Sequence, residues 1–260
     1  MSSRKVPAPV SPREVRAIPV TGIGEVAVSD SVADLIIAAL APDGFRLEAG
    51  DILVVKHKIV SKAEGRTVRI PDINPSAAAK RFATRQGSDP RVIELALREA
   101  TRVVRQKHVL ITETAHGFIC ANSGIDVSNV DGGATAVLLP LDPDRSAARI
   151  LREIKKRTTL HVPVVIADSF GRAWREGLTE VAIGVAGMKP LHDYRGQPDA
   201  YGYRLHSSVE CVADELACFA GLVCGKNAAV PACIIRGYPY RRGKGTAREI
   251  IRPAARDLFR

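Results

Sequence analysis

Patterns that reveal several common protein classes are missing from this chain of 260 residues. It has no run of 18 apolar residues, so no transmembrane helix is expected. It also lacks the G-x-x-x-x-G-K-[ST] loop of P-loop nucleotidases and the G-x-S-x-G elbow of α/β-hydrolases. Its five cysteines form no C-x-x-C pair and its six histidines form no H-x-H or H-x-x-x-H pair. These absences argue against structural zinc and against disulfide scaffolding.

Aromatic residues make up only 5% of the chain, whereas the formal net charge is +10. The segment from Arg236 to Arg260 alone contains eight basic and two acidic residues. Basic surfaces attract nucleic acids and also small phosphorylated molecules. Because aromatics are few and no RNA-recognition or zinc-finger pattern is present, an anionic substrate, or simply a role of the charge in solubility, is favoured over nucleic acid.

Hydrophobic periodicity predicts an α+β fold of mixed sheets with flanking helices, because strands and helices do not alternate in a regular βαβ order. Residues 1–14 are polar and are expected to form a disordered leader, and the odd number of unpaired cysteines indicates a cytoplasmic protein. Residues 15–260 are expected to form one unit, in which any two subdomains would be interleaved. Strands are expected at 15–20, 52–55, 109–112, 137–139, 162–167, 180–187 and 231–236, and helices at 30–40, 76–86, 90–104, 142–157 and 209–223.

Two acidic segments carry the side chains that best suit a metal–nucleotide site. Asp168 and Ser169 follow the apolar run 162–167, and Asp126 opens the segment 126–129 after a glycine-bearing turn. Carboxylate and hydroxyl oxygens are ligands for Mg²⁺ or Mn²⁺, which could hold a nucleoside triphosphate. Lys58 and Lys62, four residues apart, could neutralise its phosphates. The alternative is that these aspartates cap turns and the lysines are solvated.

The segment from Gly22 to Ala27 fits the loose dinucleotide-binding pattern G-x-G-x-x-G/A, but the acidic residue expected about 20 positions later would be Asp43, inside a turn. This motif is therefore a weak indication. Nucleophilic hydrolysis by Ser169 is also weakly supported, because no histidine partner is evident from the sequence.

Taken together, the segments resemble the coenzyme F420-0:L-glutamate ligase family in its stand-alone form. The longest matching stretch is His116-Gly-Phe-Ile-Cys-Ala-Asn-Ser-Gly-Ile-Asp-Val-Ser-Asn-Val130. The resemblance runs from about residue 17 to residue 237. The other matching stretches are residues 18–24, 50–55, 58–66, 139–144, 168–172, 174–177, 181–187, 193–196 and 212–217.

The resemblance implies a ligase that uses GTP to join the phospholactyl carboxylate of the deazaflavin F420-0 to the amine of L-glutamate. Further γ-linked glutamates can be added by members of the family. It also implies two divalent cations, Mg²⁺ or Mn²⁺, often with a monovalent cation such as K⁺. Members form intertwined homodimers with a fold unlike that of P-loop proteins.

The same resemblance implies roles for particular residues. Asp126 and Asp168 would be catalytic metal ligands, and Ser169 would supply a hydroxyl ligand where the family usually has threonine. Near residue 226 some relatives place an oxygen ligand to the second cation, whereas an ammonium such as that of Lys226 cannot ligate a cation. The residues that would contact the nucleotide are Ile23, Gly24, Glu25, Val26, His57, Lys58, Lys62, Asn129, Gly225, Lys226 and Asn227.

Three alternatives remain at this point. One is a metal-dependent nucleotide phosphohydrolase that uses the same aspartates. Another is a nucleic-acid-binding module based on the basic C-terminal segment, and the third is a ligase of the same scaffold that acts on another acid.

Overall fold

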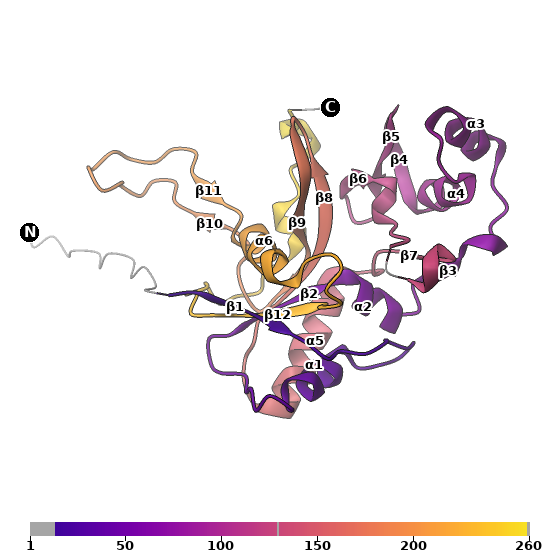
Figure 1. Ribbon diagram of the computed structural model, residues 1–260. Helices are drawn as coiled ribbons and strands as arrows, with labels where there is room; N and C mark the ends of the chain where they lie inside the picture. The colour runs from indigo at the N-terminus through magenta and orange to yellow at the C-terminus, as the bar shows by residue number, and fades with distance from the viewer. Residues whose placement is uncertain (1–13, 129, 259–260) are drawn as a thin grey trace, which may run out of the picture.

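The computed structural model describes residues 14–128 and 130–258, so the predicted leader lies almost wholly outside the described residues. Five strands form a central sheet in the order β1-β12-β2-β8-β9 (Figure 1). Only β2 and β8 are parallel neighbours, and the other adjacent pairs are antiparallel. The predicted mixed α+β architecture is thus confirmed. The strands are β1 (Arg16–Val20), β12 (Ala232–Arg236), β2 (Ile52–Lys56), β8 (Val164–Arg172) and β9 (Arg175–Ala186).

Helices bury both faces of this sheet. Successive side chains of a strand point to opposite faces, so Leu53 and Val55 belong to one core while Ile52 and Val54 belong to the other. Helix α6 (Val212–Cys224) covers the second core. Strands that are buried on both faces have continuous apolar sequences rather than an alternation of apolar and polar residues. The sequences of β2 and of the first half of β8 show such continuous apolar runs. Helices on the first face are α1 (Val32–Leu40), α2 (His57–Ala63) and α5 (Pro143–Thr158).

A smaller unit lies to one side of the central sheet and has its own core around Phe82, Ile93 and Leu110 (Figure 1). Its elements are α3 (Ala77–Gln86), α4 (Pro90–Glu99), β4 (Ala100–Lys107), β5 (Val109–Thr114) and β6 (Ile119–Ala121). Two further pairs are β3 (Thr67–Arg69) with β7 (Thr135–Val137) and β10 (His192–Asp193) with β11 (Val209–Glu210). Short 3₁₀ turns are η1 (Ile70–Asp72), η2 (Asn122–Gly124), η3 (Asp131–Gly133), η4 (Ala247–Ile250) and η5 (Ala254–Arg256).

Several local predictions were wrong. The helix expected over residues 90–104 ends at Glu99, because the β-branched residues that follow pair with β5 as strand β4. The helix expected from residue 30 begins at Val32, because Ser31 caps it: its side chain accepts a hydrogen bond from the Asp34 amide at 3.1 Å. The strand expected at 137–139 lies at 135–137.

Helix α2 was not predicted at all. Its seven residues are too few to show a helical period. Among the described residues, none of the helices combines the length and the apolar character needed to cross a membrane.

Gly184 on β9 tests the packing between the sheet and α5. A Cβ atom at this position would lie 2.4 Å from the carbonyl oxygen of Pro143, a backbone atom that cannot rotate away. We expect Gly184→Ala to lower the free energy of unfolding by about 1–3 kcal/mol or more, measured by urea denaturation. Gly171→Ala in the same hairpin is the control, because no atom lies within 4 Å of the added Cβ. Equal losses in the two variants would contradict this account of the packing.

Candidate active site

A cavity of about 420 Å³ lies where the parallel strands β2 and β8 part. Strand β2 pairs with β8 only as far as Lys56 opposite Ala167, and the chain then turns directly into α2. Ligands in α/β proteins bind at such carboxyl ends of parallel strands. The lining residues are Ile23, Gly24, Glu25, Lys56, His57, Lys58, Ile59, Lys62, Asp126, Ser128, Ala167, Asp168, Ser169, Gly225, Lys226, Asn227, Ala229, Val230 and Pro231.

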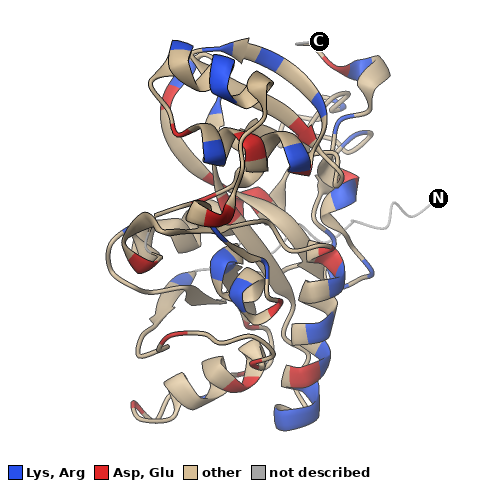
Figure 2. Ribbon diagram, turned by 90° about the vertical axis from the view of Figure 1, so that its right-hand side faces the viewer, with Lys and Arg blue, Asp and Glu red and all other residues tan. Residues whose placement is uncertain are grey.

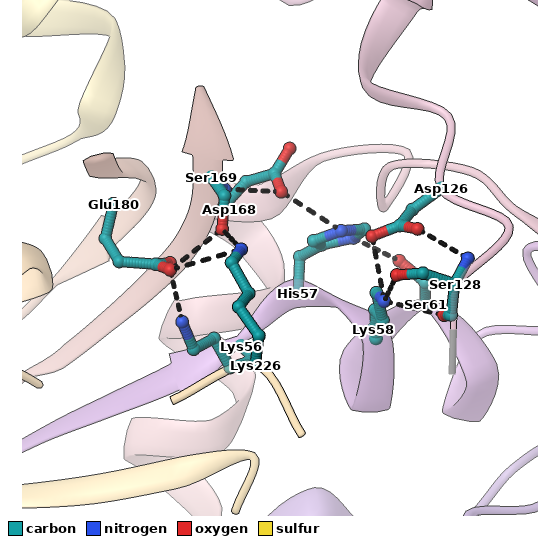
Figure 3. A network of polar contacts seen from close by, with 10 residues as sticks. All are labelled: Lys56, His57, Lys58, Ser61, Asp126, Ser128, Asp168, Ser169, Glu180 and Lys226. Atoms are coloured by element: carbon teal, nitrogen blue, oxygen red, sulfur yellow. Dashed lines mark hydrogen bonds and ion pairs between the residues drawn. The ribbon is translucent and has the colours of Figure 1, made fainter. Parts of the chain in front are cut away.

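Strand β8 continues beyond the end of β2 and presents Asp168 and Ser169 on opposite faces of the sheet. Asp168 lies on the same side as Ile166, toward α2, and Ser169 lies on the same side as Ala167, toward α6. The polar groups of the site therefore form clusters on both sides of one strand (Figure 3).

On the α2 side, Asp168 faces His57. The histidine Nε2 lies 3.4 Å from Asp168 Oδ1 and makes no hydrogen bond, although the ring is almost fully buried. The other ring nitrogen, Nδ1, lies 3.3 Å from the hydroxyl of Ser61, one helical turn further along α2. Asp168 Oδ1 accepts a hydrogen bond from the Ser169 amide at 2.7 Å.

A second acid approaches this side of the cavity from the segment after η2. Asp126 Oδ2 forms an ion pair with Lys58 Nζ at 2.8 Å, and its Oδ1 accepts a hydrogen bond from the Ser128 amide at 2.7 Å. Lys58 Nζ also donates to the carbonyl and hydroxyl oxygens of Ser128. At the rim, Lys62 Nζ pairs with Glu25 at 2.5 Å.

On the α6 side, Glu180 of β9 is the centre of a buried network. Its Oε1 lies 2.5 Å from Lys56 Nζ and accepts a hydrogen bond from the Ser169 hydroxyl at 2.8 Å. Lys226 Nζ donates to the Ser169 hydroxyl and lies 3.7 Å from Glu180. Glu180 Oε2 is buried without a hydrogen-bond partner. The glutamate side chain fits here because Gly221 of α6 has none: a Cβ there would lie 2.5 Å from Glu180 Cγ.

The carboxyl groups of the site differ in proton affinity. Burial raises the pKa of Asp168 and outweighs the lowering effects of His57 and of the hydrogen bond from the Ser169 amide, while repulsion from Asp126 and Glu180 adds a smaller increase. Burial would also raise the pKa of Asp126, but the hydrogen bond from Lys58 and those from Ser128 lower it. The pKa of Glu180 is likewise lowered, because Lys56 outweighs the effect of burial. Environments that separate the pKa values of neighbouring acids are typical of functional sites.

The structure gathers most of the residues singled out in the sequence around this one cavity. Val26 is an exception, because it is 6% exposed and packs in the first core rather than lining the cavity. Asn129 lies outside the described residues. Residues that reasoning from the sequence missed are Lys56 and Glu180, which follow or precede apolar strand runs and look like ordinary strand ends. Lys56 and Glu180 can pair only because β2, β8 and β9 lie in this order in the sheet, and the sequence does not show that order.

Carboxylate and hydroxyl oxygens, the ligands that Mg²⁺ and Mn²⁺ prefer, line the cavity together with several lysines. In the described part of the chain, no three His, Cys, Asp or Glu side chains are arranged as a closed metal cage. Mg²⁺ is usually bound by one or two carboxylates together with waters and substrate phosphates, and two repelling carboxylates on one cavity fit that pattern. The lysines that pair with them offer partners for phosphates.

Carboxylates, hydroxyls and lysines that converge on one cavity at the carboxyl ends of parallel strands are characteristic of an enzyme active site. The sequence model of the F420-0:gamma-glutamyl ligase family matches residues 22–237. The chain belongs to this family, which confirms the resemblance inferred from its motifs.

Several archaeal proteins are similar to the chain over most of its length. A coenzyme F420:L-glutamate ligase of Methanothermobacter thermautotrophicus is 45% identical over 250 residues, which cover 95% of this chain and 99% of the relative. The enzyme of the same name from Methanocaldococcus jannaschii is 42% identical, with 83% and 87% covered. That from Archaeoglobus fulgidus is 39% identical, with 95% and 96% covered.

The buried charge of Asp168 predicts a pH-dependent stability in the presence of a chelator. Because its folded pKa is raised, the native state loses stability as pH rises from the unfolded value of about 3.9 through the folded pKa. We expect Asp168→Asn to stabilise the protein, with a gain in urea midpoint that grows as pH rises from 4 to 8.

Asp126→Asn is the matched control with the opposite sign. The folded pKa of Asp126 is lowered, so its charge stabilises the native state above the unfolded value, and this contribution is lost as pH falls through the folded pKa. This variant should therefore be less stable than the parent protein at pH 8, with a smaller difference at pH 4. A change in stability of the same sign in both variants at pH 8 would contradict the opposite pKa shifts of Asp168 and Asp126.

Proposed function

We propose that this protein is a GTP-dependent ligase that joins the phospholactyl carboxylate of F420-0 to the amine of L-glutamate through an amide bond. The family match over residues 22–237 carries the proposal, because it spans every segment that lines the cavity. The cavity supports it independently, since it combines carboxylates, lysines and a loop at 225–231 that can face a nucleotide.

The reaction needs activation because a carboxylate does not combine with an amine at neutral pH. The substrate carboxylate attacks the γ-phosphorus of GTP and GDP leaves, which gives an acyl phosphate. The glutamate amine then attacks the acyl carbon, inorganic phosphate leaves and the nitrogen loses a proton. Catalysis of such a transfer consists mainly of positioning and charge stabilisation.

The residues of the cavity divide this work. Lys58 and Lys62, on one side of α2, would bind phosphate oxygens, while the loops at 23–25 and 225–227 would hold the nucleotide. Asp126, Asp168 and the Ser169 hydroxyl would hold two divalent cations, Mg²⁺ or Mn²⁺, with K⁺ in support. When bound, these cations would neutralise the charge that gathers on the transferred phosphoryl group.

Glu180 would act as a positioning residue. Its Oε1 accepts the hydrogen bond of the Ser169 hydroxyl and pairs with the Lys56 ammonium, which would fix the orientation of the hydroxyl proposed as a metal ligand. Its lowered pKa keeps it anionic at neutral pH. Lys226 contacts the same two acceptors, where it holds the 225–227 loop against β8.

We further propose that the enzyme works in the cytoplasm as an intertwined homodimer. The five cysteines are all free thiols, as a reducing compartment requires. Light scattering of the purified protein tests the dimer. Figure 2 marks acidic as well as basic positions along the ribbon, and the aromatic content of only 5% also argues against a nucleic-acid module.

The central test is a ligation assay with F420-0, L-glutamate, GTP and Mn²⁺, followed by mass spectrometry. We expect a mass gain of one glutamyl unit and loss of activity of order 10³-fold or more in Asp168→Ala. Asp34→Ala, which removes an exposed partner of Arg157 away from the cavity, is the control and should retain activity. GTP hydrolysis that needs no glutamate and yields no glutamyl product would instead identify a phosphohydrolase.

Gly221→Ala tests the positioning role of Glu180 without altering any polar group. The added methyl would displace Glu180 Cγ, whereas alanine is a better helix former than glycine. We expect kcat/KM for ligation to fall by about ten- to a hundredfold, as small misplacements in a site do, with the fold retained by circular dichroism. Leu222→Ala, at an 82% exposed position on the same helix, should leave kcat/KM unchanged. An unchanged kcat/KM in Gly221→Ala would show that Glu180 has no positioning role.

A further inference from the structure

A second cavity, of about 320 Å³, lies beside the active site and has mostly apolar walls. It is enclosed by the β4–β6 sheet, the β8–β9 hairpin and the segment around η4. The side chains that shape it include Val104, Phe118, Phe170, Val181 and Ile251. Neither the nucleotide phosphates nor glutamate suits such walls, because burying their charges without partners is costly.

The two cavities are built on the same stretches of chain. On β8, Asp168 lines the active-site cavity and Phe170 lines the apolar one. Residues two apart in a strand point to the same face and lie about 7 Å apart. The chain on either side of β6 does the same: Phe118, just before this strand, lines the apolar cavity, and Asp126, after it, lines the polar one. A molecule with an apolar end and an anionic end could therefore extend along β8 between them.

The aromatic side chains of the apolar cavity are held in place. The ring of Phe118 stacks on His116 at 5.4 Å, and His116 Nε2 lies 2.9 Å from the Pro140 carbonyl oxygen. The rings of Phe118 and Phe170 meet nearly edge to face, with centroids 6.5 Å apart. Fixed rings at this angle offer one face and one edge to a flat aromatic guest.

At the far side, Arg252 adds a cationic group, and Asp214 is already engaged because it accepts a hydrogen bond from the Ala182 amide at 2.8 Å. The walls therefore present fixed rings and aliphatic groups, with the charged side chains of Arg252 and Asp257 at one end, where Arg252 also donates a hydrogen bond to the Arg256 carbonyl oxygen.

We propose that the apolar cavity binds the deazaflavin ring of F420-0, while the phosphodiester side chain runs along β8 and delivers its carboxylate to Asp168 and Asp126. This inference rests on the proposed function and adds to it the site that selects the acceptor. Specificity for the acceptor would then come from Phe118 and Phe170, separately from the residues that bind GTP.

Two substitutions with opposite effects on the volume of the cavity test the proposal. Phe170→Ala removes one ring, and Val104→Trp fills the cavity from β4, away from the catalytic aspartates. The control is Val109→Trp on the adjacent strand β5, a 38% exposed position that does not line the cavity. For each variant we would measure KM for F420-0, Kd for GTP, and quenching of the fluorescence of a deazaflavin riboside that lacks the phospholactyl group.

We expect KM for F420-0 to rise about tenfold or more in both cavity variants and riboside binding to weaken in parallel, with Kd for GTP changed by less than about twofold. The Val109 control should match the parent protein. Unchanged KM and riboside binding in Val104→Trp would overturn the inference. A raised Kd for GTP with an unchanged KM for F420-0 would also overturn it, since the cavity would then hold guanine.

Failure of the proposed function gives a different result. In that case the parent protein itself would add no glutamate to F420-0, whatever the cavity variants do. Thermal unfolding of each variant by circular dichroism shows whether it is folded, and the GTP affinity shows whether the neighbouring cavity is intact.

Discussion

Strand β2 ends at Lys56, whereas its parallel neighbour β8 continues through Asp168 to Arg172 with only β9 beside it. The site depends on this difference in length. It opens one side of β8 at the position where the strand becomes polar, and it lets α2 begin immediately beside the opening. The five-stranded sheet anchors the arrangement with apolar cores on both faces, so the polar extension of β8 is held on a rigid base.

The part of β8 that extends beyond β2 lies among three carboxylates, and lysines neutralise two of them. Lys58 and Lys56 pair with Asp126 and Glu180, while Asp168 faces a histidine that makes no hydrogen bond to it. A carboxylate whose pKa is raised by burial destabilises the folded protein when it is ionised. In the proposed reaction, a bound cation would offset this cost, and the phosphates of the nucleotide would take over the lysines.

The β8–β9 hairpin also explains how one strand can serve two kinds of ligand. Its polar positions, Asp168 and Ser169, face the active-site cavity, and Phe170 faces an apolar one. A substrate with an aromatic ring at one end and an anionic chain at the other matches this order along the strand. The small unit of β4–β6 completes the apolar cavity, which gives this appended sheet a role in selecting the acceptor.

The sequence by itself determined the main strands, most helices and the family, because long apolar runs, helix caps and extended motifs are local signals. It also identified Asp126, Asp168, Ser169, Lys58 and Lys62 as candidates. It could not reveal α2, whose seven residues show no period, or the change from helix to strand after Glu99, which pairing with β5 imposes. Only the tertiary structure placed Val26 in the core and brought Lys56 and Glu180 together. The physical reason is that pairing between distant strands decides which polar side chains share a cavity, and no local pattern encodes that choice.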